Sequence, residues 1–493
     1  MFRRKKKICK GNIKNIGIQG NIILMITYRI IITIVPLLTT PYISRVLSPE
    51  DIGNYSYTQS ICAYFGVFAG LGVNIYGQRE IAFLKNNKQA YSKTFWEIII
   101  IRSVTTIISS GIYLYLVNSY FNWRLKIYFL IQIIDLFGGL LDISWFFFGL
   151  ENFLIVVKKN LFLKLLTIGG IFLFVKSPED IYIYVCINSV ALIFSGLIFW
   201  VDIHLYVNKV LIRTLQFTKH IRSMITLFLP SVAETLYNKI DITMLGFMIK
   251  NSVETAYYQQ TVKISIIAST TIATVGGVIA PRLAYLFANE TREELERYFW
   301  KGFDAFCITG IPISFGLYAI ADTLVPWFLG NQYIKVGILL QIMAPLCLLN
   351  GINNYLGSQY LIATKRQTQY TFVILIGLLI NILFNYISIP LLESKGAIIA
   401  SLISESFILG IEIFIIYKEI KIVKILNIIP KKVLSALIMS MLVRKFSLIT
   451  LDLVTKVICQ ILLGVVIYGI MLLVFKDQLT LEIIQKALKH RKE

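Results

Sequence analysis

The chain has 493 residues, 57% of them hydrophobic, and a mean hydropathy of +0.73. This composition excludes a soluble globular protein, so we expect an all-α integral membrane protein. The net charge of +21 would suit a nucleic-acid partner, but the basic residues lie in short segments between apolar stretches. That pattern follows the positive-inside rule and argues against nucleic acid. The six cysteines and three histidines show no metal-ligand spacing, so no metal site or cofactor is expected.

The two ends of the chain are basic. Residues 3–7 are all Arg or Lys, but the apolar stretch that follows is too long for a signal peptide and has no small-residue cleavage site. We therefore predict that residues 1–21 form a cytoplasmic tail against anionic lipid, ahead of an uncleaved first span. Residues 476–493 mix lysines with spaced apolar residues, which predicts a second cytoplasmic tail on the membrane surface.

Between the tails lie fourteen apolar segments, each near the length of about 20 residues that a helix needs to cross a bilayer. The fifth segment is short and the last two are weaker, so twelve is the alternative count. Lys and Arg gather on one side of this topology, which places both chain ends in the cytoplasm. The predicted spans are 22–40, 55–76, 97–117, 126–148, 161–176, 181–201, 223–247, 255–280, 302–321, 335–358, 371–389, 397–417, 431–448 and 453–475.

The two halves of the chain contain a faint internal repeat. Residues 51–55 align with 254–258, and Arg79 aligns with Arg282, each at the cytoplasmic end of an apolar span. Six spans separate the copies, so both halves enter the membrane in the same sense. Such a parallel repeat predicts an axis along the membrane normal and a substrate path between the halves. The predicted division is an N-lobe over 22–222, a C-lobe over 223–417 and two further spans within 418–475.

One predicted span, 223–247, carries three charged residues, Glu234, Lys239 and Asp241. Each charge costs about 2.5–3.5 kcal/mol near the bilayer centre, so the span requires an internal, hydrated or ion-paired environment. Pro230 removes a helical hydrogen bond and predicts a bend. We interpret this helix as the wall of a translocation cavity. The alternative is a static ion-paired cluster that holds helices together.

The same span presents its polar residues on one face. Glu234, Asn238 and Asp241 are spaced i, i+4 and i+7, with Tyr237 beside them. Carboxylates recur two turns apart in other spans, which puts each pair on one helical face. The pairs are Asp135 with Asp142, Glu234 with Asp241, and Glu405 with Glu412.

A set of ordered motifs points to a family. Residues 41–50 read PYISRVLSPE and precede Gly53, and residues 77–82 read GQREIA. Together the motifs resemble the bacterial polysaccharide repeat-unit flippases (Wzx type) over essentially the whole chain. Ser48 departs from this pattern, because the family usually has glycine there. The other matching segments are 149–151, Leu229-Pro230, Leu236-Tyr237, Asp241, 244–246, Tyr258, Lys263, Pro281-Arg282, and Gly396-Ala397 with Ala400 and Glu405.

The resemblance implies a member of the multidrug/oligosaccharidyl-lipid/polysaccharide exporter superfamily. The implied fold has two pseudo-symmetric six-helix lobes in a V around a central cavity, plus two extra C-terminal helices that help form a groove for a lipid tail, here about 431–475. The implied substrate is an undecaprenyl-diphosphate-linked oligosaccharide, flipped to the outer leaflet of the bacterial cytoplasmic membrane for capsule or O-antigen synthesis. The implied partners are membrane lipids, a polysaccharide polymerase and chain-length proteins.

Basic residues inside the spans are the candidates for holding the diphosphate. The head group has to cross about 30 Å of hydrocarbon, so cations in a hydrated cavity must replace its water. Arg29, Lys239 and Lys263 lie within predicted spans and are our hypothesis for the mid-path site. Arg79 and Arg282 would make the first contact at the cytoplasmic mouth. The alternative for these two is that they snorkel as positive-inside charges.

The carboxylates are the candidates for coupling to a proton or sodium gradient, or for neutralising the bases between substrates. Glu234 and Asp241 are the first choice, followed by Asp135 and Glu405. Asp142 and Glu412 lie nearer the cytoplasmic edge and are predicted to be interfacial. Sugar contacts require aromatic and amide groups. The candidates are Tyr237, Asn238, Tyr257, Tyr258 and Gln259.

Two other functions remain as alternatives. A cation-coupled antiporter for small cationic drugs would share the architecture but would have a cavity dominated by acids. A membrane enzyme such as a polysaccharide polymerase would need a large extramembrane loop with acid and base residues, and the sequence contains none. The phosphate-binding motif GxxxxGK[ST] is also absent, so we expect a transporter without ATP hydrolysis of its own.

Overall fold

The computed structural model describes residues 35–420, 422–482 and 485, and these ranges contain helices and turns but no strand. A helical stretch over 35–46 leads into the first half of the molecule. That half consists of α3 (Pro49–Gly70), α4 (Val73–Leu84), α5 (Lys88–Tyr120), α6 (Trp123–Leu141), α7 (Ser144–Gly149), α8 (Phe153–Phe174), η1 (Pro178–Asp180), α9 (Ile181–Trp200), α10 (Ile203–Tyr206) and η2 (Ile212–Thr214).

The second half begins with a long helix that leaves the N-lobe. It consists of α11 (Thr218–Met248), α12 (Ser252–Asn289), α13 (Arg292–Phe328), η3 (Asn331–Tyr333), α14 (Ile334–Asn353), the π-helical segment η4 (Asn354–Leu361), α15 (Gln367–Leu392), α16 (Ser394–Ile416), η5 (Ile422–Lys424), α17 (Ile425–Phe446) and α18 (Leu453–Val474).

The predicted spans coincide with these helices. Every span from 55–76 onward overlaps a helix of at least 19 residues. In the described ranges, nine helical segments are long and apolar enough to cross a membrane. The chain is therefore an all-α, multi-pass membrane protein, as its composition predicted. The first predicted span, 22–40, and Arg29 within it lie outside the described residues, except for 35–40, which are helical.

Two predicted spans are broken by short non-helical stretches. Span 126–148 is divided between α6, which ends at Leu141, and α7, which begins at Ser144. The segment 55–76 is broken, because α3 ends at Gly70 and α4 begins at Val73. Leu71 and Gly72 adopt left-handed backbone angles, with φ of 42° and 72°. Glycine takes this conformation without steric cost, and a Cβ at position 72 would lie 3.0 Å from the carbonyl oxygen of Met224 on α11. Apolarity alone does not reveal such a break.

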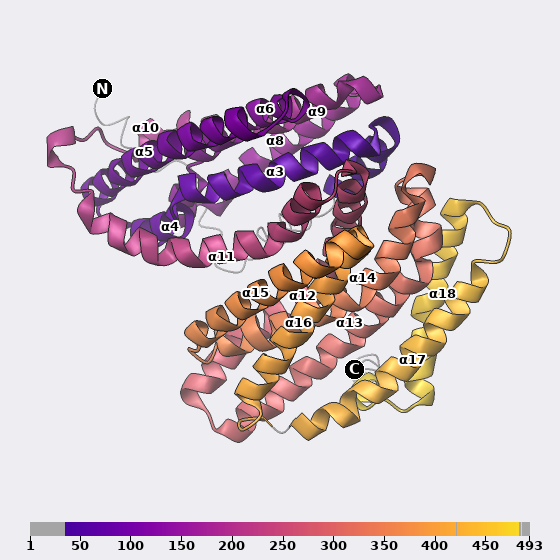
Figure 1. Cartoon of the computed structure of the whole chain (residues 1–493). Coiled ribbons are helices and arrows are strands. Elements are labelled where there is room, and N and C mark those ends of the chain that lie inside the picture. Colours follow the sequence, from indigo (N-terminus) through magenta and orange to yellow (C-terminus); the bar gives the residue numbers. More distant parts are fainter. Residues whose placement is uncertain (1–34, 421, 483–484, 486–493) are drawn as a thin grey trace, which may run out of the picture.

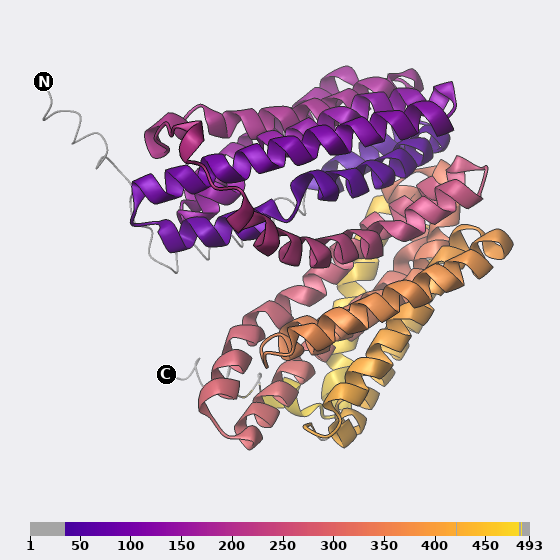
Figure 2. The ribbon, with the colours of Figure 1, turned by 60° about the vertical axis from the view of Figure 1, so that its left-hand side comes forward.

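The helices form two bodies. Figure 1 shows α3 to α10 (the N-lobe) above α12 to α18 (the C-lobe), with α11 running along the underside of the N-lobe. In Figure 2 the ribbons of the two bodies meet on the right and diverge toward the left. The contact is made mainly by α3 against α11 and α12. The result is the V-shaped arrangement expected from the resemblance.

Each lobe has its own aromatic core. Phe95, Trp145 and Phe146 are buried and packed together in the N-lobe. In the C-lobe, Phe299 and Phe303 pack against Tyr355. Within a bilayer, helices associate through such close packing rather than through transfer of side chains from water. The two cores give each lobe rigidity of its own.

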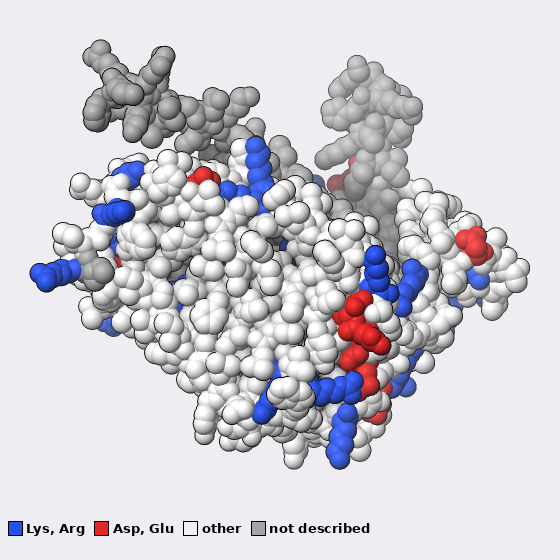
Figure 3. All heavy atoms as spheres, turned by 90° about the horizontal axis from the view of Figure 1, so that it is seen from above, with Lys and Arg blue, Asp and Glu red and all other residues white. Residues whose placement is uncertain are grey.

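The outer surface fits a lipid environment. Figure 3 shows a broad uncharged expanse over the N-lobe, with Lys, Arg, Asp and Glu gathered at its margins. Exposed large apolar residues occur along the helices, for example Ile107 at 64% and Leu166 at 55%. Such a surface would be costly in water and is expected where acyl chains cover it.

The lobes touch through residues that the internal repeat aligns. Gly53 of α3 packs against the backbone of Ser252 and Ala256 at the start of α12, so close that a Cβ at Gly53 would collide with them. Ala256 is the residue that the repeat aligns with Gly53. Contact between equivalent residues is what an axis passing between α3 and α12 requires.

The same end of the molecule carries matching ion pairs. At the start of α3, Asp51 accepts a hydrogen bond from Tyr128 (3.0 Å) and pairs with Arg124 of α6 (3.5 Å). At the start of α12, Glu254 pairs with Lys335 of α14 (2.5 Å). In both lobes an acid in the first turn of one helix, where the helix dipole favours negative charge, meets a base in the first turn of another helix.

The C-terminal helices are attached to the C-lobe by a buried ion cluster. Lys432 of α17 is 1% exposed and pairs with Asp304 of α13 (2.5 Å) and with Asp477, just after α18 (2.6 Å). Because a buried charge without partners is costly, each acid depends on this lysine. The cluster joins α13, α17 and the end of α18.

Candidate functional site

Helix α11 is packed on both lobes. Near its start, the Nδ1 atom of His220 lies 2.6 Å from the hydroxyl of Tyr76, and the Nε2 atom lies 2.7 Å from the carboxylate of Glu97. Toward its end, α11 bonds to α15 and α16 of the C-lobe. Pro230 lies between these two parts, and in Figure 1 α11 curves from the N-lobe toward the C-lobe. Any relative motion of the lobes must therefore involve this helix.

Lys239 and Lys263 lie where the lobes converge. Lys239 is one turn before Thr243, whose hydroxyl bonds to side chains of α3, and so faces the N-lobe. Lys263 is two turns after Ala256, which packs on Gly53 of α3. Both lysines are half-buried, and their charges are close enough to interact. Neither has an acidic partner within ion-pair distance among the residues described.

Such a pair of cations favours an anion with more than one charge. Partly desolvated ammonium groups that lack counter-ions gain most from a multivalent oxyanion, because charge-assisted hydrogen bonds are strong there. Two lysines in one place also repel each other, and an anion between them relieves that repulsion. Lys239 and Lys263 therefore stay the candidate site for an anion with more than one charge.

Asp241 lies in a hydrogen-bond network inside the C-lobe. Its carboxylate accepts hydrogen bonds from the hydroxyl of Tyr258, from the hydroxyl of Ser401 (2.7 Å) and from the side-chain amide of Asn385 (2.6 Å). Asn385 also donates to Asn381 (2.9 Å). The network joins α11, α12, α15 and α16, and no base pairs with Asp241 within the described part of the chain. Its proposed coupling role stays a prediction.

A polar cavity of about 400 Å³ opens in the C-lobe beside α11. Glu234 and Asn238 stand at its exposed rim. Deeper, Tyr237 donates its hydroxyl hydrogen to the carboxylate of Glu405, and three asparagines of α14 and η4 complete the wall. The lining contains three carboxyl groups and no basic side chain. The polar lining residues are Glu234, Tyr237, Asn238, Asn350, Asn353, Asn354, Tyr370, Thr371, Glu405 and Glu412.

Glu412 does not lie at the interface, contrary to the prediction. It is fully buried in the C-lobe and lines this cavity. Hydropathy placed it near a span end, but α14 continues through the π-helical η4, which packs against α16 and covers that end. Asp142 fits its predicted position better, because it caps the end of α6 with its backbone N–H and accepts a bond from Ser144 N–H (2.9 Å).

The N-lobe has a smaller polar cavity of about 320 Å³. Asp135 of α6 lines it with one buried carboxylate oxygen that lacks a hydrogen-bond partner among the described residues. Tyr55 and Gln59 of α3 and the exposed Lys164 of α8 also line it. This cavity contains one acid where the C-lobe cavity contains three.

Arg79 and Arg282, the predicted first contacts, are both exposed. The Arg79 guanidinium lies 5.7 Å from the ring centre of Tyr76, and that of Arg282 lies 4.9 Å from the ring centre of Tyr285. Each arginine is thus held over an aromatic ring three residues away in the chain, with its charge in solvent. Arg29, the remaining predicted base, lies outside the described residues.

Sequence reasoning missed several residues of these networks. His220 falls between two predicted spans but is buried at the start of α11 beside Glu97. Asn385 and Ser401 were not singled out, although they hold Asp241. The available signal was a pair of amides one turn apart, Asn381 and Asn385, in the largely apolar span 371–389. Single polar residues in apolar spans are functional or structural candidates by default.

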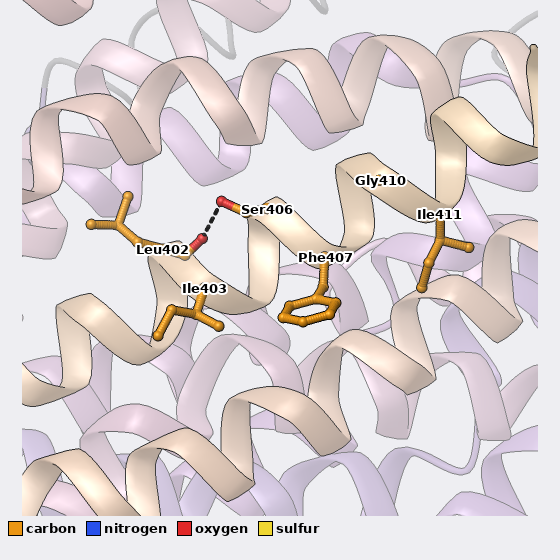
Figure 4. Close-up of a pocket in the computed structure, with 6 residues that line it drawn as sticks. All are labelled: Leu402, Ile403, Ser406, Phe407, Gly410 and Ile411. Atoms are coloured by element: carbon orange, nitrogen blue, oxygen red, sulfur yellow. Dashed lines mark hydrogen bonds between the residues drawn. The ribbon is translucent and has the colours of Figure 1, made fainter.

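The outer face of α16 differs from its inner face. Figure 4 shows Leu402, Ile403, Phe407 and Ile411 along α16, with Ser406 donating its hydroxyl hydrogen to the carbonyl of Leu402 (2.7 Å). Ser406 and Phe407 are exposed, whereas Glu405 and Glu412 of the same helix are buried. An intrahelical bond of this kind satisfies a hydroxyl in an apolar setting. The helix thus separates a lipid-facing surface from the polar cavity.

Comparisons of the sequence agree with the fold. The model of the family described as "Polysaccharide biosynthesis protein" matches residues 18–287. The "Putative O-antigen transporter" of Shigella dysenteriae is 25% identical over 378 residues, which cover 76% of this chain and 93% of that protein. The protein of the same description from Escherichia coli (strain K12) is 24% identical over 403 residues, covering 80% of this chain and 96% of the relative.

Solved structures share the architecture. The lipid II flippase MurJ in its inward closed conformation superposes with a TM-score of 0.75 at 17% identity, covering 93% of this chain and 99% of MurJ. An inward-facing multidrug resistance transporter of the MATE family has a TM-score of 0.56 at 13% identity, covering 78% of this chain and 96% of the transporter. These similarities show that the chain has the two-lobed fold of MurJ and of the MATE transporter.

Proposed function

This chain belongs to the polysaccharide biosynthesis protein family, whose model matches residues 18–287, and on that premise we propose that it transports polysaccharide repeat units. The substrate that we propose is an oligosaccharide linked through diphosphate to undecaprenol. The protein flips it from the cytoplasmic to the outer leaflet of a bacterial cytoplasmic membrane for O-antigen or capsule synthesis. The names of the relatives from Shigella dysenteriae and Escherichia coli support this assignment.

The single observation that carries the proposal is a pair of lysines that have no acidic partner among the described residues, where α11 and α12 approach α3. Lys239 and Lys263 come from different helices, α11 and α12, and face the N-lobe helix α3. A diphosphate that enters between the lobes meets both charges, while its lipid tail stays in the bilayer. The bases thereby replace part of the hydration that the anion loses.

The proposed orientation makes this conformation inward-facing. With both chain ends in the cytoplasm, the starts of α3 and α12 lie on the outer side, where Gly53 packs on Ser252 and Ala256. The lobes diverge toward the opposite side (Figure 2), so that the lysines would be reached from the cytoplasm. Alternating access then consists of separating the Gly53 contact and closing the cytoplasmic side.

The proposal is tested by a leaflet-accessibility assay. Purified protein is reconstituted into vesicles that contain fluorescent undecaprenyl-diphosphate oligosaccharide, and a membrane-impermeant reagent modifies only the lipid in the outer leaflet. We expect the whole pool to become accessible over time in the presence of the protein and only the outer half in its absence. A modified fraction that is the same in empty vesicles would contradict the proposal.

A second function has one observation in its favour. The C-lobe cavity is lined by Glu234, Glu405 and Glu412 without a base, which suits a small organic cation better than a diphosphate. An antiporter of this kind would move a fluorescent cation across vesicles in response to a proton or sodium gradient. Cation movement without any lipid flipping would favour the antiporter over the flippase.

A further inference from the structure

The C-lobe cavity contains two glutamates in opposite environments. Glu405 and Glu412 are two turns apart on α16 and line the same cavity. The carboxylate of Glu405 accepts hydrogen bonds from the hydroxyl of Tyr237 and the side-chain amide of Asn353. A carboxylate that receives hydrogen bonds from several donors is stabilised in its charged form. Burial disfavours the anion at both positions, but of the two acids Glu405 is the better able to carry a negative charge.

Glu412 has no such partners. Its side chain is fully buried, and neither carboxylate oxygen has a hydrogen-bond partner among the residues that the structure describes. A buried, unpaired carboxylate is very costly as an anion, and a group in this position takes up a proton instead. Two carboxyl groups whose surroundings differ in this way divide the acid and base roles between them.

The surroundings of Glu412 are built to hold a neutral carboxyl group. Gly357 of the π-helical η4 faces it, and a Cβ there would collide with the carboxyl of Glu412 and with the ring of Tyr370 on α15. Only glycine leaves this space free. Single-turn π-helical segments inside α-helices are frequent at functional sites, and here the segment lies directly against the buried acid.

No positive charge faces Glu412 from the described helices packed on α16, which are α11, α12, α14, α15 and η4. The titratable groups on that side are Tyr370 from α15, Glu405 from α16 itself, and Glu234 with Tyr237 from α11. On α12, Tyr258 is engaged by Asp241. On α14 and η4 the lining side chains are asparagines. The negative charge of Glu405 further favours the neutral form of Glu412.

We propose that Glu412 is a proton-binding site, filled from water in the C-lobe cavity past the exposed rim at Glu234, and that its proton drives the transport cycle. This inference rests on the proposed function. In the step itself, a hydronium ion gives its proton to one oxygen of Glu412, and no other bond forms or breaks. Release returns the proton to water once the cavity opens around the charged carboxylate.

The coupling follows from the position of α11. Tyr237 of α11 bonds to Glu405, so the same helix that crosses between the lobes closes the cavity around both acids. Loss of the proton from Glu412 would leave two buried negative charges in one cavity, which favours a conformation that admits water. Proton occupancy thus shifts the balance between two arrangements of the lobes.

The binding site is tested without transport. In difference infrared spectra of the purified protein during a pH jump, we expect the carbonyl band of a protonated carboxylic acid that the variant E412Q lacks. The matched control is E179Q, which removes an exposed glutamate of η1 and should retain the band. Because glutamine has the shape of neutral glutamic acid, E412Q should fold. An identical band in E412Q would overturn the site.

The coupling is tested in the vesicle assay. We expect a pH gradient to accelerate flipping by the intact protein and by E179Q, whereas flipping by E412Q is independent of the gradient. Acceleration of E412Q by the pH gradient, or acceleration of the intact protein by a sodium gradient alone, would overturn the coupling role. If the intact protein flips no lipid, the proposed function fails, while the infrared result still decides whether Glu412 binds a proton.

Discussion

The polar cavity of the N-lobe contains one carboxyl group, Asp135, together with the exposed Lys164. The polar cavity of the C-lobe is lined by Glu234, Glu405 and Glu412, and no base lines it among the described residues. The lobes nevertheless share their plan, because α3 and α12 begin at aligned residues and each starts with an acid paired to a neighbouring helix. The two halves of the repeat therefore share the arrangement of their helices but differ in the charged residues that line their cavities. We therefore expect ion binding in the C-lobe cavity rather than in the N-lobe cavity.

The largest effect is expected where the two lobes meet. The double substitution of Lys239 and Lys263 by glutamate removes two charge-assisted bonds worth about 1.5–3 kcal/mol each, so we expect flipping to fall at least about a hundredfold by the relation between free energy and rate. The measurement is the leaflet-accessibility rate in vesicles. Lys250→Glu, at the exposed end of α11, is the matched control and should flip normally. Normal flipping by the double variant would remove the lysine pair from the site.

The next effect concerns the contact that closes the V. Gly53→Ala places a methyl group against the backbone of Ser252, so we expect the lobes to separate at that end. Spin labels at Ser119 and Asn251, in a cysteine-free background, would report a longer distance. Gly66→Ala is the control, because a Cβ at Gly66 has only Leu136 nearby, at 3.9 Å. An unchanged distance in Gly53→Ala would argue that the contact does not hold the lobes together.

The third effect concerns the attachment of α11 to the N-lobe. His220→Ala leaves Tyr76 without its partner and removes one partner of the buried Glu97. We expect a loss of about 1–3 kcal/mol in stability, the usual cost of an unsatisfied buried polar group. Thermal unfolding of the detergent-solubilised protein measures it, with the exposed His204→Ala as control. Equal melting temperatures for the two variants would show that His220 does not stabilise the attachment of α11 to the N-lobe.

The smallest effect compares the two matching ion pairs. Arg124 is largely exposed, so Arg124→Gln should cost about 0.2–1 kcal/mol, as surface pairs do. Lys335 pairs with Glu254, whose side chain is 4% exposed, so Lys335→Gln should cost more, about 1–3 kcal/mol, because it leaves a buried acid without its base. The same unfolding measurement ranks them. Equal losses would mean that the pairs are equivalent in energy as well as in position.

The helices were predictable because hydropathy and length fix them within a bilayer. Every span from 55–76 onward overlaps a long helix, and the motifs at residues 41–50 and 77–82 identified the family. The break at Leu71 and Gly72 could not be read from apolarity. It depends on the approach of α11, which is a contact between residues more than a hundred positions apart.

The site was predictable only in part. Charged residues within span 223–247 predicted that α11 lines a polar space, and α11 does line the C-lobe cavity. The binding role of Lys239 and Lys263 stays a prediction. The sequence could not separate Asp241, held by donors from three helices, from Glu412, which has none among the described residues. In the sequence, Asp241 and Glu412 are both carboxylates within predicted spans. Their difference is set by which neighbouring helices supply amides and hydroxyls, and that is decided by tertiary packing.

The buried cluster at Lys432 has a mechanical consequence. Because this lysine joins α17 to Asp304 of α13 and to Asp477 after α18, the two C-terminal helices cannot swing away from the C-lobe without breaking the ion pairs of a buried lysine. Helices α17 and α18 must therefore move together with the C-lobe whenever the two lobes change their relative position. An acyl chain that lies along α17 and α18 would then move together with its head group. A long lipid would not have to cross the full thickness of the bilayer by diffusion alone.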